Sequence, residues 1–319
     1  MKSINLPLYL ISMFLIFSCG QDLDDPVDPF QGEHEEEEEQ PPNTLMDEEG
    51  NIFYCGVDNL CYGFSGGLPG GDGTLNDYEI PEDLPESFDL SEFLPPVRSQ
   101  GQQGSCSAWA TSYYMKYLQE NIEHGVDSIV PILSPAYTYN TITMGECEGT
   151  AVTAHLQLLK DQGVCTWSSF PYTDQECIDQ PNELHHEEAS FSKIADFKRL
   201  SGENMIDEMK ALLVNQIPIV LSVALDQEFG KKDALNLTAY REHPMTSEDV
   251  TCSHAMLAVG YDDDKDAFKL VNSWGPEWGD DGFVWVDYEA FANVLNDDYS
   301  FKVICRAIVA FDEIEEDED

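Results

Sequence analysis

The sequence predicts an α+β protein with two lobes, because helical patterns dominate the chain up to about residue 215 and strand patterns dominate after it. Apolar residues recur at the three- to four-residue spacing of half-buried helices in 107–119, 150–160 and 203–215. Short apolar runs typical of strands follow at 217–223, 255–261, 267–271, 283–286 and 301–309. A chain of 319 residues is long enough for one such two-lobed domain with tails.

The first helix is expected directly after Cys106 and before Gly125. Gly101 and Gly104 allow the entering chain to turn tightly, which places the Cys106 sulfur at the positive end of the helix dipole. A helix N-terminus lowers the pKa of a thiol, and the thiolate is the reactive form of cysteine. Backbone N–H groups at that end can also receive an oxyanion. Cys106 is therefore a candidate nucleophile.

The strands 255–261 and 267–271 are joined by an acidic turn and predict a β-hairpin. His254 precedes the first strand and Asn272 follows the second, so the hairpin carries both toward the same end. The Asn272 amide oxygen can accept the imidazole N–H and orient the ring without adding a charge. A helical lobe carrying Cys106 then faces a β-rich lobe carrying His254 and Asn272, with a cleft for an extended peptide between them.

These segments resemble those of the papain-like cysteine peptidases. The resemblance lies in Gln100 to Cys106, in Ser253-His254-Ala255 with Val259-Gly260-Tyr261, and in Asn272 to Phe283. Cys106 and His254 lie 148 positions apart, and His254 and Asn272 lie 18 apart, which fits the family in order and rough size. The similarity runs from about Leu84 to Val309.

The resemblance implies a papain-like two-lobed fold, with the helical lobe facing a β-barrel-like lobe across the active-site cleft. It implies a cysteine endopeptidase that acts on proteins or peptides through a thioester acyl-enzyme, as a monomer and without cofactor or metal. The implied roles are Cys106 as nucleophile, His254 as base and acid, Asn272 as orienter, and Gln100 as oxyanion donor beside the Cys106 N–H. Trp274 would shield the His254–Asn272 hydrogen bond, and Ser253 and Ala255 would line the cleft.

Two further readings of the same motifs stay open. One is a catalytically silent surface module that keeps the cleft in order to bind peptides. The other is a cell-wall amidase or transpeptidase that uses the same thiol chemistry.

The composition is strongly acidic, with 15 Lys and Arg against 62 Asp and Glu and a formal charge of −47. We therefore do not expect binding to nucleic acid, because its phosphates are bound by Lys and Arg. Residues 20–50 contain thirteen acids and no Lys or Arg, and the last eight residues contain seven acids. Both segments are interpreted as solvated tails. The expected organisation is a leader (1–18), an acidic tether (19–50), an N-terminal extension without an assigned role (51–83), a peptidase domain (84–311) and an acidic tail (312–319).

The N-terminus resembles the signal of a bacterial lipoprotein. Lys2 precedes an apolar stretch from Leu6 to Phe17, which is shorter than a membrane span, and Cys19 follows as the lipid-accepting residue. We expect an exported lipoprotein held in the outer membrane of a Gram-negative bacterium through this anchor. Acidic residues just after such a cysteine, here Asp22, Asp24 and Asp25, favour the outer face of that membrane.

The remaining cysteines fit an oxidising compartment. Cys55 and Cys61 are close enough for a local loop, and Cys147, Cys165 and Cys177 can supply one more pair. Cys252, two residues before His254, is expected in the cleft and not in a bridge. The connectivity itself is not deducible from the sequence.

Other candidate features have simpler interpretations. His185, His186, Glu187 and Glu188 could bind a metal, but a solvated loop is favoured, and Asp262 to Asp266 could bind calcium, but an exposed turn is favoured. No amphipathic helix long enough for the family's inhibitory prodomain precedes Leu84. Whether Asn51 to Tyr62 folds back as a small plug is left open.

Overall fold

The computed structural model describes residues 40–57, 74–75, 78–125, 128–200, 204–231, 249–292 and 303–312. The expected leader, Cys19 and most of the tether lie outside the described residues, as does the C-terminal tail after Asp312. The described residues belong to the unit Gln40–Asp319.

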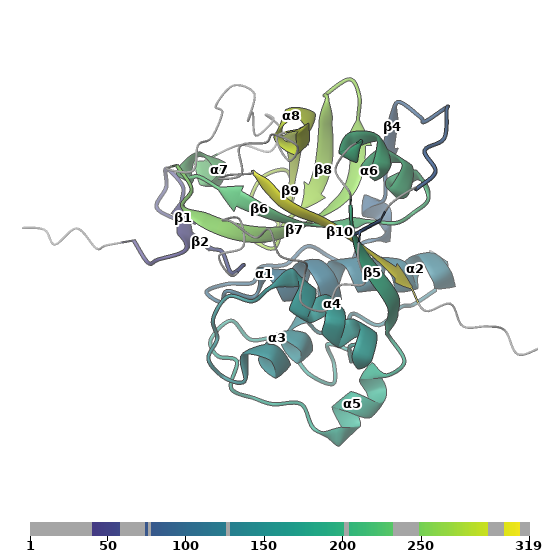
Figure 1. The fold of residues 1–319 in the computed structure, drawn as a ribbon. Helices are drawn as coiled ribbons and strands as arrows, with labels where there is room; N and C mark the ends of the chain where they lie inside the picture. The colour runs from purple at the N-terminus through teal and green to yellow at the C-terminus, as the bar shows by residue number, and fades with distance from the viewer. Residues whose placement is uncertain are drawn as a thin grey trace, which may run out of the picture. The chain divides into compact units, whose positions relative to one another are not determined.

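The helical lobe is built around one long helix that starts at Cys106 (Figure 1). It runs as α1 (Cys106–Ala108), a π-helical stretch (Trp109–Lys116) and α2 (Tyr117–His124), and it ends at Gly125 with φ 80°. Positive φ is a conformation that glycine adopts readily. The other helices of the lobe are α3 (Pro135–Thr143), α4 (Val152–Asp161) and α5 (Glu183–Ala189).

The β-rich lobe contains a mixed eight-stranded sheet, mostly antiparallel, with the strand order β3-β5-β10-β6-β7-β8-β9 and β4 added at β7. Its strands are β3 (Thr74–Leu75), β4 (Ser87–Asp89), β5 (Ile194–Leu200), β6 (Ile219–Leu225), β7 (Cys252–Asp262), β8 (Ala267–Val271), β9 (Phe283–Asp287) and β10 (Ile304–Asp312). The helices α6 (Met205–Val214), α7 (Gln227–Lys231) and α8 (Tyr288–Ala292) accompany these strands, and a short 3-10 helix spans Ser91–Phe93.

The two lobes meet along the long helix and the central strands. The helix buries Trp109, Tyr113 and Tyr114 almost completely, and it packs against β6 and β7. Lys116 is 2% exposed and forms ion pairs with Glu120 and Asp312, so a charge links the π-helical stretch to the end of β10. Burial of these aromatic rings makes the lobe interface rigid, which fixes the start of the helix relative to the sheet.

The predicted α+β fold is confirmed, and each predicted helix and strand is present. α3 and β5 are among the elements that the sequence patterns did not predict. α3 begins with Ser134, whose side chain accepts from Tyr137 N–H, followed by proline, which is a recognisable start signal. β5 alternates buried and exposed residues too irregularly to be recognised as an apolar run.

The segment around His185 and His186 is a helix, α5, and not the expected solvated loop. It starts at a capping box, in which the Asn182 side chain accepts from Leu184 N–H and His185 N–H while His185 Nδ1 accepts from Asn182 N–H. The His186 ring is hydrogen-bonded to the Tyr137 hydroxyl at 2.7 Å. Both histidines therefore already have structural partners.

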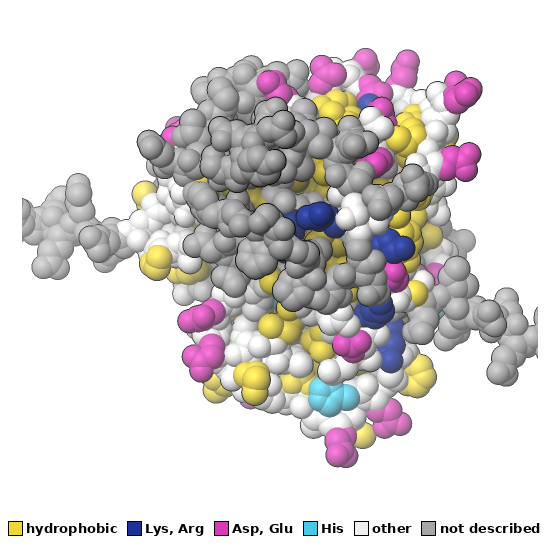
Figure 2. All heavy atoms as spheres, in the orientation of Figure 1, with side chains coloured by type: hydrophobic (Ala, Val, Ile, Leu, Met, Phe, Trp, Pro, Cys, Tyr) yellow, Lys and Arg dark blue, Asp and Glu magenta, His cyan; other side chains and the backbone are white. Residues whose placement is uncertain are grey.

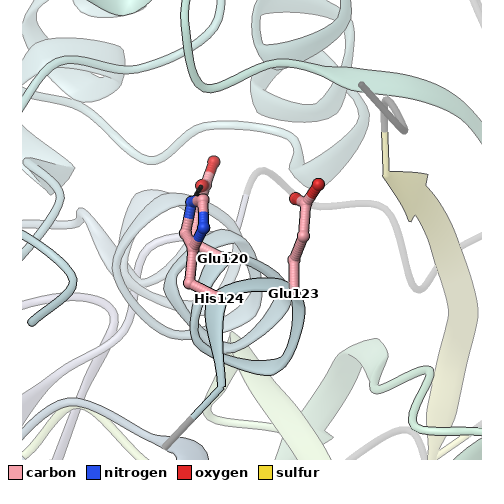
Figure 3. A group of neighbouring side chains, drawn as sticks. All are labelled: Glu120, Glu123 and His124. Atoms are coloured by element: carbon pink, nitrogen blue, oxygen red, sulfur yellow. Dashed lines mark ion pairs between the residues drawn. The ribbon is translucent and has the colours of Figure 1, made fainter. Parts of the chain in front are cut away.

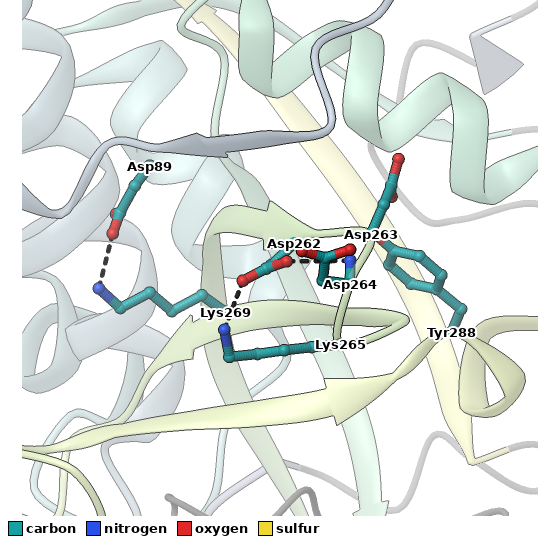
Figure 4. A network of polar contacts seen from close by, with 7 residues as sticks. All are labelled: Asp89, Asp262, Asp263, Asp264, Lys265, Lys269 and Tyr288. Atoms are coloured by element: carbon teal, nitrogen blue, oxygen red, sulfur yellow. Dashed lines mark hydrogen bonds and ion pairs between the residues drawn. The ribbon is translucent and has the colours of Figure 1, made fainter.

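The acidic stretch between β7 and β8 forms the expected hairpin turn (Figure 4). Asp262 pairs with Lys265 and accepts from Asp264 N–H, and the Lys265 ammonium holds the pKa of the Asp262 carboxyl below its usual value despite partial burial. Lys269 pairs with Asp89 at 2.7 Å, and Tyr288 donates to Asp263 at 2.7 Å. The acids of this turn thus fix the hairpin that ends at Asn272.

Charged groups elsewhere follow the acidic composition. Figure 2 shows Asp and Glu side chains mainly at the upper and lower edges of one face, with Lys and Arg side chains nearer its middle.

On α2, Glu120, Glu123 and His124 point the same way and come close enough to hold a cation (Figure 3). Glu120 already neutralises the buried Lys116, so this group has a structural use. Within the described residues, no helix combines the length and the apolar character needed to cross a bilayer.

Candidate active site

Cys106 is the first residue of α1, and its side chain is fully buried. α1 packs against β7. The backbone N–H groups of Ala255, Ser107 and Gly56 face the Cys106 sulfur. Because Ala255 is the neighbour of His254, the cysteine of the helical lobe lies at the histidine-bearing part of the sheet.

His254 and Asn272 are held together by a direct hydrogen bond. His254 lies on β7 and Asn272 directly follows β8, which pairs with β7 in antiparallel register. His254 Nε2 lies 2.7 Å from Asn272 Oδ1, and Ser273 N–H donates to the same oxygen at 2.7 Å. That oxygen is an acceptor, so Nε2 carries the hydrogen and Nδ1 of the neutral ring keeps a lone pair. Nδ1 has no hydrogen-bond partner among the described residues.

Trp274 covers this pair. Its ring centroid lies 4.7 Å from that of His254, and only 6% of the residue is exposed. Trp278 packs edge-on against Trp274, and Phe229 stacks on Trp278. The aromatic cluster keeps water away from the histidine ring.

Gln100 is fully buried, and its amide is fixed from both ends. Ser273 Oγ donates to Gln100 Oε1 at 2.6 Å, while Gln100 Nε2 donates to the carbonyl of Gln103 at 2.8 Å. Nε2 also donates to the carbonyl of Tyr54 at 3.0 Å. A donor in this position can bind an oxygen that gains negative charge.

Tyr54, whose carbonyl accepts from Gln100 Nε2, belongs to an N-terminal segment that covers the candidate site. This covering segment consists of residues 40–57 and contains a short hairpin of β1 (Thr44–Met46) and β2 (Ile52–Tyr54). Trp274 Nε1 donates to the Tyr54 carbonyl at 2.9 Å, and the Phe53 ring stacks on Trp274 with centroids 5.0 Å apart. The sequence left open whether Asn51 to Tyr62 folds back as a plug. Residues 51–57 of that stretch do fold back onto these side chains.

The end of the covering segment is bonded to both lobes. Gly56 N–H and Val57 N–H donate to the Ser253 carbonyl at 3.3 and 3.1 Å, and Thr150 N–H donates to the Gly56 carbonyl at 2.7 Å. A Cβ atom on Gly56 would lie 2.1 Å from the Gly104 oxygen, so only glycine fits there. Leu45 is buried, although the sequence predicts a solvated tether as far as residue 50. The long-range contacts of the hairpin explain this difference.

Burial dominates the protonation of the covered site. It raises the pKa of the Cys106 thiol to about 12, although the facing N–H groups act in the other direction. Burial also lowers the pKa of His254 to about 4, against the opposing effect of the Asn272 hydrogen bond. Under the covering segment the two groups are therefore a neutral thiol and a neutral imidazole at neutral pH.

Comparison with known proteins gives the family of the chain. The family model for papain family cysteine proteases matches residues 84–300, about two thirds of the chain. The chain belongs to the papain family.

Its relatives in the papain family include cysteine proteinase 3 of Dictyostelium discoideum, 28% identical over 66% of this chain, and a cathepsin L-like proteinase of Fasciola hepatica, 27% identical over 63%. The chain spans 60% of the length of each of these two relatives. Among solved structures, xylellain, a cysteine protease from Xylella fastidiosa, has a TM-score of 0.62 at 24% identity and covers 77% of this chain and 96% of its own. This likeness shows the papain-like fold.

The disulfides differ in part from the expectation. Cys147 is bonded to Cys177, as one of the pairs that the sequence allowed. The expected local loop of Cys55 and Cys61 is wrong, because Cys55 is bonded to Cys252 across 197 positions. Cys252 therefore forms a bridge, although it was expected not to. Cys106 and Cys165 are free within the described part of the chain.

Proposed function

We propose that this papain-family protein is a cysteine peptidase that hydrolyses peptide bonds with Cys106, His254, Asn272 and Gln100. The supporting observation is that His254, fixed by Asn272 at 2.7 Å, lies beside the residue whose N–H faces the Cys106 sulfur. Three segments far apart in the sequence thus supply a nucleophile, a base and an orienting group in one place.

In the proposed mechanism, His254 Nδ1 takes the proton of the Cys106 thiol, and the sulfur attacks the carbonyl carbon of the peptide bond. The negative oxygen is stabilised by Gln100 Nε2 and the Cys106 backbone N–H. His254 then gives its proton to the leaving amine, and a thioester on Cys106 is left. Water, deprotonated by His254, hydrolyses the thioester, which yields the acid and restores the thiol.

The direct test is hydrolysis of an unfolded protein and of fluorogenic peptides by the reduced full chain. Cys106→Ala should abolish hydrolysis. Cys165→Ala is the matched control, because Cys165 is the other free and buried cysteine, and it should keep activity near that of the parent. Hydrolysis that survives Cys106→Ala would refute the proposal. Internal cleavage of the unfolded protein would show endopeptidase action.

We also propose that the chain is exported and anchored through a lipid on Cys19, which lies outside the described residues. The support is the pattern of Lys2, the apolar stretch and Cys19 in the sequence. In a Gram-negative host, labelled fatty acid should appear on the parent and not on Cys19→Ala. Equal labelling of both proteins would refute the anchor, and protease added to intact cells would test the outer-face location.

A further inference from the structure

The covering segment occupies side chains of the candidate site. The Gly56 N–H is one of three backbone groups near the Cys106 sulfur, and it also donates to the Ser253 carbonyl at 3.3 Å. The nearby carbonyl of Tyr54 is taken by two donors, Gln100 Nε2 at 3.0 Å and Trp274 Nε1 at 2.9 Å. The segment thus occupies the proposed oxyanion donor.

A disulfide bond fastens this segment to the site. Cys55 stands between Tyr54 and Gly56, and its disulfide partner Cys252 lies on β7, two residues before His254. Apart from this bond, residues 53–57 are held by the hydrogen bonds and the ring stack described above and by burial of Val57. A tether keeps a bound segment in place through a high effective concentration, and cutting the tether removes that advantage.

We propose that the Cys55–Cys252 disulfide is a reducible latch, and that a small dithiol or thiol reductant opens it to expose Cys106. This inference rests on the proposed peptidase function. The latch would make a reductant, and not a second protease, the agent that activates the enzyme.

The surroundings of the disulfide fit this use. Both cysteines line a cavity of about 650 Å³, together with Gly56, Glu148 and Thr251. The cavity gives a small reductant an approach, although Cys55 and Cys252 are themselves only 3% and 4% exposed. Cavities of this size admit small organic molecules.

The reaction balances without any further component. One thiolate of the reductant attacks a sulfur of the disulfide, forms a mixed disulfide and releases the other cysteine as a thiolate. The second thiol of the reductant then displaces the first cysteine. Two electrons and two protons pass to Cys55 and Cys252, and the reductant leaves as its cyclic disulfide. Departure of the segment readmits water, and this removes the burial that keeps Cys106 and His254 neutral.

The test uses the full chain purified without reductant, with its disulfides verified by mass spectrometry. Two rates are measured, alkylation of Cys106 by iodoacetamide and hydrolysis of a fluorogenic peptide. Cys55→Ser and, separately, Cys252→Ser should alkylate at Cys106 at least about tenfold faster than the oxidised parent. The double variant Cys147→Ser with Cys177→Ser is the matched control, because it removes a disulfide that does not involve the covering segment, and it should stay as slow as the parent.

An oxidised parent that alkylates and hydrolyses as fast as Cys55→Ser, with its Cys55–Cys252 bond intact, would overturn the latch. If both serine variants fail to fold, the parent is reduced with a phosphine and desalted, and unchanged slow alkylation would overturn the latch as well. Fast alkylation of Cys55→Ser without hydrolysis of any peptide would instead contradict the proposed function and leave the latch standing.

Discussion

Replacing Asn272 with alanine tests whether the orientation of His254 matters for catalysis. In the structure Asn272 Oδ1 accepts from His254 Nε2 at 2.7 Å and from Ser273 N–H at 2.7 Å, and the side chain is fully buried. Asn272→Ala leaves the buried Nε2–H without its partner. Losing a partner in such a place costs about 1–3 kcal/mol. If the imidazolium formed during the reaction needs this bond, that cost appears in the barrier, and kcat/KM falls roughly 5- to 150-fold.

The assay is kcat/KM of the reduced full chain on a fluorogenic peptide, together with its pH profile. Asn121→Ala is the matched control, because Asn121 is a buried asparagine that donates one hydrogen bond to the Phe93 carbonyl, away from Cys106. Both variants should lose some thermal stability, but only Asn272→Ala should lose activity and shift the pH profile. Equal kcat/KM for Asn272→Ala and the parent would refute the argument.

Three further outcomes follow from particular residues. Gly56→Ala should speed alkylation of Cys106 in the oxidised protein several-fold, because the new Cβ would lie 2.1 Å from the Gly104 oxygen and would displace the covering segment. Glu48→Ala, at an exposed position of the same segment, should leave the alkylation rate unchanged. Equal alkylation rates of the two variants would count against the covering role. Burial lowers the pKa of His155 to about 3, below its unfolded value, so its contribution to stability is present above about pH 6.5 and is lost as the pH falls toward 3. The free energy of unfolding, measured with urea, should therefore fall by on the order of 3 kcal/mol between pH 7 and pH 4 because of this residue. A His155→Gln variant whose free energy of unfolding depends on pH as steeply as that of the parent would contradict this. Lys116→Ala removes the buried ammonium that pairs with Glu120 and Asp312. It should lower the free energy of unfolding by about 3 kcal/mol, whereas a change below about 0.5 kcal/mol would show that the ion pairs contribute little.

The parts of the site that depend on local patterns could be predicted from the sequence. The hairpin of β7 and β8 follows from two apolar runs and an acidic turn, and it does bring His254 and Asn272 within 2.7 Å. The helix at Cys106 follows from its periodicity, although the π-helical stretch inside it leaves no sequence signal that could have been recognised.

The covering segment could not be predicted, because it depends on contacts between distant residues. Its acidic flank and its glycines suggest a solvated chain, while Leu45 and Phe53 find apolar surface only on the folded β-rich lobe. The bond between Cys55 and Cys252 spans 197 positions, and spacing alone favours the nearer Cys61. The closeness of Gly56 to Gly104 is likewise a property of the fold.

The most direct measurement of the central claim is the alkylation rate of each thiol in the reduced Cys55→Ser chain at mildly acidic pH, read peptide by peptide in the mass spectrometer. An ordinary thiol is nearly inert there, whereas a thiolate paired with an imidazolium reacts. The account predicts that Cys106 is labelled much faster than Cys252 and Cys165, and that His254→Ala abolishes this preference. Labelling of Cys106 no faster than that of Cys252, or a preference that survives His254→Ala, would contradict it.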